Sequence, residues 1–136
     1  AAFVGGSNLL SGKIVSLSGQ WFDIDCGGAV IVRAALPNSA APAQIGDRVF
    51  LSVRPEAIEI SAAGATPGAR NALQGRLAAS AYQGSYVEYE ITALGKAWKA
   101  RAHNPKGKAL FEAGAEVALT FDPDDVVIVP AQREAT

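Results

Sequence analysis

Aromatic and charged side chains are concentrated between residues 82 and 103. An aromatic ring face beside a carboxylate binds an organic cation through cation–π and ion-pair contacts. This segment could therefore form a small-molecule site for a cation such as a polyamine. Against this, aromatic residues on strands more often serve packing, and glutamates on an outer strand face are usually solvated. The candidate ligand-binding residues of the segment are Tyr82, Tyr86, Glu88, Trp98, Arg101 and His103.

The first half of the chain offers fewer candidates. Arg54 and Glu56 flank a proline in the stretch "VFLSVRPEAIEI", and both are candidate ligand contacts. Arg54 would pair with a carboxylate of a ligand, of the other half of the chain or of a partner subunit. The alternative is an exposed ion pair, worth about 0–1 kcal/mol. Trp21 shares a strand face with Asp23, and a half-exposed tryptophan on a polar face is typical of an interface. Trp21 and Arg54 are therefore the candidate interface residues.

The elements that position these side chains are short strands, because apolar residues recur with a two-residue period. On this period Tyr89 points inward with Val87 and Ile91, whereas Tyr86 and Glu88 face the opposite way. We expect five strands near residues 9–17, 20–26, 29–35, 47–54 and 57–61, and five more near 72–82, 85–93, 96–103, 115–121 and 125–129.

The chain also contains an internal repeat. The stretch "NLLSGKI" at 8–14 matches "NALQGRL" at 71–77, and "GDRVFLSVRPEAIEI" at 46–60 matches "GAEVALTFDPDDVVI" at 114–128. Between these anchors we align residues 22–26 with 87–91, and residues 29–33 with 97–101. Residues 1–61 are thus the first repeat, 62–70 a linker of small residues, glycine and proline, and 71–136 the second repeat.

Each repeat is predicted to form a small OB-like barrel, because five short strands with a long connection before the fourth are typical of that fold. Apolar residues make up 49% of the chain, which is ample for a packed core. The fold class is therefore all-β, with two tandem OB-like lobes that are packed against each other or interleaved.

Charge and composition exclude several classes of function. The net charge is −1 and there is no run of lysine or arginine, which disfavours a free-standing nucleic-acid binder. Cys26 is the single cysteine, so an internal disulfide and a cysteine-based zinc site are excluded, and a buried structural thiol is the favoured interpretation. The single histidine, His103, leaves little for a histidine-rich metal site, and we expect no metal.

No apolar run approaches the length of a membrane span, and the N-terminus lacks a signal pattern. Because the sequence begins "AAFVGG" without methionine, we expect a fragment of a longer protein.

Four stretches taken together resemble a known family: "FVGGSNLLSGKI", "VFLSVRPEAIEI", "NALQGRLAASAYQGSYVEYEI" and "FDPDDVVIV". They are similar, in this order and over nearly the entire chain, to the transport-associated OB (TOBE) domain. That domain forms the C-terminal region of ATP-binding subunits of importer-type ABC transporters. The pattern of Tyr82, Gly84 and Ser85, followed by Tyr89 or by the nearby Tyr86, resembles the spermidine/putrescine branch.

The resemblance implies a non-catalytic regulatory and dimerisation module. In that family the parent protein hydrolyses ATP, and two ATP-binding subunits dimerise on the cytoplasmic side of an inner-membrane permease. The implied partners are thus an ATPase domain of the same chain, a second ATP-binding subunit, the permease subunits and a small solute. This chain has no G-x-x-x-x-G-K-[ST] phosphate loop, so we expect no cofactor here, and ATP and Mg²⁺ would be bound by the ATPase domain of the parent.

Other classes of function remain as alternatives. Tandem OB-like copies beginning "ARNALQGRL" also resemble molybdate-binding modules, which hold an oxyanion with backbone amides and serine, threonine and lysine side chains. The acids of "FDPDDVVIV" stand where such a site would need donors, which argues against an oxyanion. A nucleic-acid-binding OB protein would have this fold but a more basic surface. An enzyme is least favoured, because serine, cysteine and histidine form no nucleophile pattern.

Overall fold

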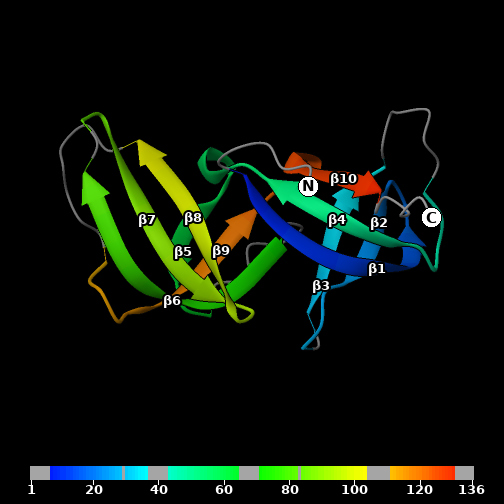
Figure 1. Cartoon of the computed structure of the whole chain (residues 1–136), viewed down its shortest axis with the longest axis horizontal. Helices are drawn as coiled ribbons and strands as arrows, with labels where there is room; N and C mark the ends of the chain where they lie inside the picture. The colour runs from blue at the N-terminus through cyan, green and yellow to red at the C-terminus, as the bar shows by residue number, and fades with distance from the viewer. Residues whose placement is uncertain are drawn as a thin grey trace, which may run out of the picture.

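A computed structural model describes residues 7–28, 30–36, 43–64, 71–82, 84–103 and 111–130 (Figure 1). Within these residues the chain is all-β, as predicted, with ten strands and two short 3₁₀ turns. None of the described helical segments is long and apolar enough to cross a membrane. The strands are β1 (Asn8–Ser18), β2 (Trp21–Asp25), β3 (Ile31–Ala35), β4 (Arg48–Val53), β5 (Glu59–Ala62), β6 (Asn71–Tyr82), β7 (Tyr86–Ala93), β8 (Lys96–His103), β9 (Glu116–Phe121) and β10 (Val126–Pro130).

The strands form two antiparallel five-stranded sheets that exchange their last strands. The first lobe has the order β10-β4-β1-β2-β3, and the second lobe has the order β5-β9-β6-β7-β8. Strand β5 comes from the first repeat but pairs with β9, and β10 comes from the second repeat but pairs with β4. Residues 62–70 therefore separate two sequence repeats but do not separate two structural units. A two-residue period identifies a strand but not the sheet that it joins, so the interleaved alternative is the one realised.

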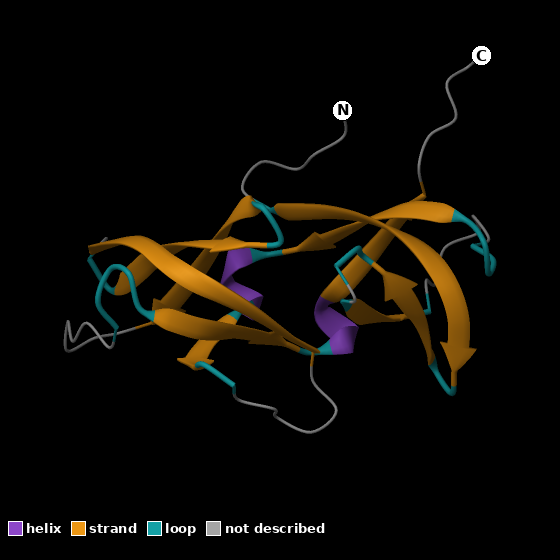
Figure 2. Cartoon of the chain, turned by 90° about the horizontal axis from the view of Figure 1, so that it is seen from below, coloured by secondary structure: helices purple, strands orange, loops and turns teal. Residues whose placement is uncertain are grey.

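The Arg-Pro-Glu stretch is the point at which the chain leaves one lobe for the other. Strand β4 ends at Val53, and the turn η1 (Pro55–Ala57) leads into β5. The turn η2 (Pro123–Asp125) leads from β9 into β10 in the same way. Proline has no backbone N–H and fixes its own φ angle, so it ends the ladder at each crossing. Figure 2 shows both turns in the middle of the molecule, between the lobes.

A buried apolar side chain faces the interior at nearly every second position of these strands. In the first lobe these include Ile14, Ile24, Val32 and Leu51, and in the second Leu77, Ile91, Trp98 and Leu119. The predicted inward orientation of Tyr89 is confirmed, since its exposed fraction is 2%. Val126 and Ile128 of β10 are also buried, at 3% and 7%, although they belong to the second repeat and β10 pairs with a strand of the first.

Two equivalent glycines allow the sheets to curl. Gly12 on β1 packs against β2, where an added Cβ would lie 2.6 Å from Ile24 Cγ2 and 2.9 Å from the Asp25 carbonyl oxygen. Gly75 on β6 packs against β7, with an added Cβ 2.8 Å from both Ile91 Cγ2 and the Thr92 carbonyl oxygen. The register shifts soon after each glycine, between Ile14 and Ser16 and between Leu77 and Ala79. Bulges of this kind bend a strand and increase its twist, as closure of a small barrel requires.

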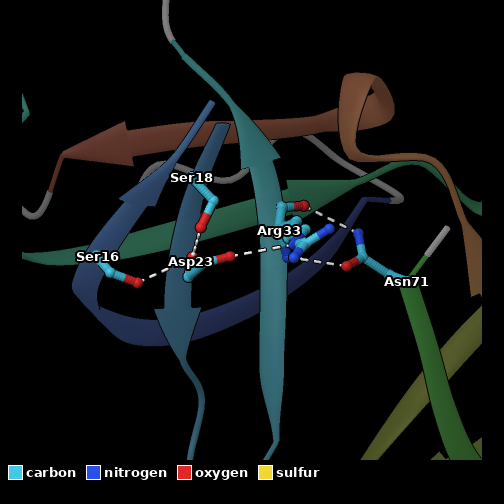
Figure 3. Close-up of polar contacts among 5 residues, drawn as sticks. All are labelled: Ser16, Ser18, Asp23, Arg33 and Asn71. Carbon is cyan, nitrogen blue, oxygen red and sulfur yellow. Dashed lines mark hydrogen bonds and ion pairs between the residues drawn. The ribbon is translucent and has the colours of Figure 1, made fainter. Parts of the chain in front are cut away.

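Two asparagines connect the lobes at equivalent places. The Asn71 side chain accepts a hydrogen bond from the Arg33 N–H at 2.8 Å and donates to the Arg33 carbonyl at 2.9 Å (Figure 3). The Asn8 side chain accepts from the Lys99 N–H at 2.7 Å and donates to the Lys99 carbonyl at 2.8 Å. We call Asn8 and Asn71 the asparagine clamps. Because β3 and β8 are the outer strands of their sheets, each clamp satisfies backbone groups that would otherwise be free at a sheet edge.

Gly12→Ala is expected to lower the free energy of unfolding by about 1–3 kcal/mol, because the new methyl group must displace a neighbouring backbone carbonyl as well as a side chain. Denaturant unfolding followed by tryptophan fluorescence measures the change. Ser11→Ala is the control, since Ser11 is the preceding residue of the same strand and is exposed. Equal stability of the two variants would contradict the close approach of β1 and β2.

Asn71→Ala is expected to cost about 1–3 kcal/mol of unfolding free energy, because it leaves the N–H and the carbonyl of Arg33 without this partner. Asn71 is 6% exposed, whereas Asn8 is only half-buried. The matched variant Asn8→Ala should therefore cost less, as water can reach the groups that it releases. A midpoint of denaturation that is unchanged in Asn71→Ala would show that the clamp is dispensable.

Candidate functional site

A partly buried carboxylate organises the polar face of the first lobe (Figure 3). Asp23 lies on β2 between β1 and β3, and its side chain is 13% exposed. Ser16 donates a hydrogen bond to Asp23 Oδ2 at 2.8 Å, and Ser18 donates to the same oxygen. The other oxygen, Oδ1, accepts from Arg33 Nε at 3.2 Å. Arg33 also covers the Trp21 ring, with its guanidinium carbon 5.5 Å from the ring centroid.

These contacts hold Asp23 in its ionised form. Burial raises the pKa of an isolated carboxyl, but the hydrogen bonds from Ser18 and Ser16 and the ion pair with Arg33 outweigh it, so the pKa of Asp23 is lowered. Both carboxylate oxygens thus have partners within the chain. An ionised acid that is already bonded by two hydroxyls and a guanidinium is a structural group rather than a general base.

The second lobe repeats the chemistry of aromatic ring, acid and arginine on β7 and β8. Arg101 Nη2 lies 3.6 Å from Glu88 Oε2, and the Arg101 guanidinium carbon lies 5.0 Å from the centroid of the Tyr86 ring. The cation of Arg101 therefore occupies the position between ring and carboxylate that an organic cation would take. Arg33 does the same between Trp21 and Asp23 in the first lobe.

The two arrangements are not at equivalent positions, and this corrects our alignment of the central strands. Ile14 pairs with Ile24, and the equivalent Leu77 pairs with Ile91, so Ile24 corresponds to Ile91 and not to Tyr89. In the same way Arg33 corresponds to Lys99 and not to Arg101. The β6–β7 hairpin continues by a further residue pair before its turn, and this extension shifted the sequence match by two residues.

The structure brings together three of the residues predicted to bind a ligand, Tyr86, Glu88 and Arg101. His103 is exposed and pairs with Tyr86 across β7 and β8. Tyr82 is 52% exposed and pairs with the inward-facing Val87, so it lies on the face opposite Tyr86.

Other predicted residues lie elsewhere. Trp98 is a correction: it is 1% exposed, donates a hydrogen bond to the Ala93 carbonyl at 3.0 Å and stacks on Phe121, so it is a core residue. Arg54 and Glu56 lie at the first crossing, outside the cluster. Their charged groups are 3.8 Å apart and their side chains are 73% and 53% exposed.

Cys26 is half-buried rather than fully buried. Burial and the charge of Asp25 raise the pKa of its thiol to about 11. Since the thiolate is the reactive form, the thiol is a poor nucleophile at neutral pH. The expected structural role therefore fits its chemistry, although part of the side chain reaches solvent.

Two hollows lie on the outer face of the second lobe, and neither was expected from the sequence. The first is about 170 Å³, well below the usual size of a ligand pocket, and it lies beside the small residues of β6. The second is about 560 Å³ and lies over Gly75, where Arg76 and Glu116 bond to each other at 3.0 Å. Small side chains on a curled strand are the only signal that could have indicated them. The first is lined by Ala79, Ser80, Ala81, Glu88, Tyr89, Glu90 and Lys99, and the second by Gln74, Gly75, Arg76, Thr92, Ala93, Leu94, Gly95 and Glu116.

The chain is similar to curated proteins over nearly its full length. It is 28% identical over 134 residues to the spermidine/putrescine import ATP-binding protein PotA of Rubrobacter xylanophilus, which covers 98% of this chain and 34% of that protein. It is 30% identical over 142 residues to PotA of Frankia alni, covering 96% of this chain and 30% of that protein. PotA of Thermotoga maritima is 25% identical over 139 residues, covering 98% and 37%. The chain thus spans about a third of the length of these relatives.

A solved structure has the same fold. The cytoplasmic molybdate-binding protein ModG, with molybdate bound, superposes with a TM-score of 0.81 over 94% of this chain and 99% of that chain. Its sequence is 16% identical, so this likeness concerns the fold alone, and it confirms the two OB-like lobes. The model of the TOBE domain family matches residues 51–129, more than half of the chain. That match, together with the PotA relatives, confirms the resemblance inferred from the sequence: the chain belongs to the TOBE domain family.

Proposed function

We propose that this chain is the non-catalytic regulatory and dimerisation domain of the ATP-binding subunit of a polyamine-type ABC importer. The observation that carries the proposal is the extent of the similarity. At least 96% of the chain aligns with about a third of each of three proteins named as spermidine/putrescine import ATP-binding proteins. A segment that matches one part of a larger protein so fully is best explained as the same part of a similar protein.

In this proposal the domain acts with partners that supply the chemistry. An ATPase domain of the same polypeptide binds ATP and Mg²⁺, and a second ATP-binding subunit completes a homodimer. The pair works on the cytoplasmic side of the inner membrane against the permease subunits. The exposed guanidinium of Arg54, at the first crossing, and the half-buried Trp21 are the proposed contacts with the second subunit.

The geometry of the second lobe favours a domain that holds the two subunits together, which we call a brace, over a domain that senses the solute. An organic cation would need the Tyr86 ring and the Glu88 carboxylate, yet Arg101 already lies against both. A ligand would have to displace a tethered guanidinium, which competes at a high effective concentration. The domain therefore contributes contacts between subunits rather than a pocket for the transported solute.

An oxyanion-binding module is the second candidate, because the fold closely follows that of ModG. The acidic stretch Asp122, Asp124 and Asp125 at the second crossing disfavours an anion there, since all three residues are exposed around η2 and would repel it.

A chimera tests the main proposal. This chain is joined to the ATP-binding subunit of Thermotoga maritima PotA in place of the region that it matches, and spermidine uptake is measured in cells that lack their own ATP-binding subunit. Uptake should return to the level given by unaltered PotA, whereas PotA without the region should be impaired. The same chimera carrying Gly12→Ala provides a matched control for a destabilised domain. A chimera that folds but transports no better than the truncated subunit would oppose the proposal.

A ligand series distinguishes brace, sensor and oxyanion module. We expect the midpoint of thermal unfolding of the chain to stay constant with millimolar spermidine, putrescine, sulfate or molybdate. A ligand that bound only the native state would stabilise it by about 2.7 kcal/mol at a hundredfold excess over its Kd. A saturable rise with spermidine would make the domain a solute sensor, and a rise with molybdate would favour the second candidate. Arg101→Ala is the informative variant, because it vacates the space beside Tyr86 and Glu88 and should allow spermidine to raise the midpoint.

A further inference from the structure

Each lobe is completed by a strand from the other repeat. Val126 and Ile128 of β10 are buried against β4, where Ile128 pairs with Leu51. In the second lobe Ile60 of β5 pairs with Leu119 of β9. Removing either exchanged strand would therefore strip one lobe of a ladder and part of its apolar interior. The loss would fall on the lobe to which the strand does not belong in sequence.

The crossing turns add a second connection. The turn η1 packs against β8, and η2 packs against β3, so each turn rests on the outer strand of the lobe that the chain is entering. Pro55 and Pro123, the first residues of the two turns, are buried. An exchanged strand cannot detach from its lobe without loosening the turn that precedes it.

The asparagine clamps form a third connection between the lobes. Asn8 stands on β1 of the first lobe and bonds the backbone of Lys99 in the second, while Asn71 stands on β6 of the second lobe and bonds the backbone of Arg33 in the first. Asn8 also donates to the Val53 carbonyl at 3.1 Å, at the residue where β4 ends and the first crossing begins. Both clamps thus act at the junction that the exchanged strands span.

We propose that the two lobes are a single cooperative unit, so that a partner held by one lobe stabilises the other. Strand exchange, crossing turns and clamps all break together if either lobe opens. Opening of one lobe alone would leave unpaired backbone and exposed apolar surface in its neighbour. A partner that binds one lobe only in its folded state then stabilises both lobes, by mass action. The coupling of the lobes is a property of the chain itself and does not depend on the proposed transporter.

The two tryptophans allow a direct test, because Trp21 lies in the first lobe and Trp98 in the second. Trp98→Phe leaves a reporter in the first lobe, and Trp21→Phe leaves one in the second. Denaturant unfolding of each variant is followed by fluorescence, alone and combined with Ile128→Ala. Ile128 is the probe because it is buried in the first lobe although it belongs to the second repeat.

Under the proposal Ile128→Ala lowers the denaturation midpoint equally for both reporters, since neither lobe unfolds alone. Val127→Ala is the matched control on the same strand: Val127 is 59% exposed, and neither reporter should move. A shift confined to the Trp21 reporter, or a second transition in either variant, would overturn the proposal. If Ile128→Ala prevents folding, Ile128→Val replaces it with the same expected outcome.

Native-state hydrogen exchange of the chain without substitutions gives an independent reading. The most protected amides of β1 and β6, the central strand of each lobe, should open with the same free energy and the same denaturant dependence. Unequal values for the two strands would also overturn the proposal.

Discussion

The pairing of β4 with β10, and of β9 with β5, is the constraint on which the rest of this molecule depends. A strand in the middle of a sheet must find hydrogen-bond partners on both sides, because buried backbone groups left unpaired cost free energy comparable to a lost hydrogen bond. Strand β4 finds β1 on one side and, on the other, only the strand contributed by the second repeat. The reciprocal arrangement at β9 gives the crossing turns and the clamps their places, since they lie at the junction between the lobes.

On the polar faces of both lobes, arginine side chains contact aromatic rings and carboxylates of the same chain. Arg33 and Arg101 each lie over an aromatic ring and beside a carboxylate, at 3.2 Å from Asp23 and 3.6 Å from Glu88. A partly buried guanidinium is stabilised by such neighbours, and its planar shape fits both at once. The same residue types that suggested a binding site for an organic cation are thus engaged by cations of the chain itself.

The sequence predicts those features of the fold that have a local sequence pattern, and not those that depend on contacts between distant residues. Strand positions depend on a two-residue period, and the expected 9–17 and 96–103 differ from the observed Asn8–Ser18 and Lys96–His103 by a residue or less at each end. Asn8 and Gly12 were visible as residues shared with the second repeat, but their roles depend on contacts with distant strands. The exchange of β5 and β10 has no local signal at all. Trp98 was misplaced because the alternation of Ala97, Trp98 and Lys99 did not show which face of the strand Trp98 occupies.

Comparison of equivalent residues shows where the two lobes have diverged. Inside, Leu51 corresponds to Leu119, and both are fully buried. Outside, Phe50 is 39% exposed in the first lobe, whereas its equivalent Ala118 in the second is fully buried. Interior positions differ as well: Val32 corresponds to Trp98 and Val53 to Phe121, and all four are buried. The outer faces, held in fixed relation by the exchanged strands, therefore present different side chains on the two lobes.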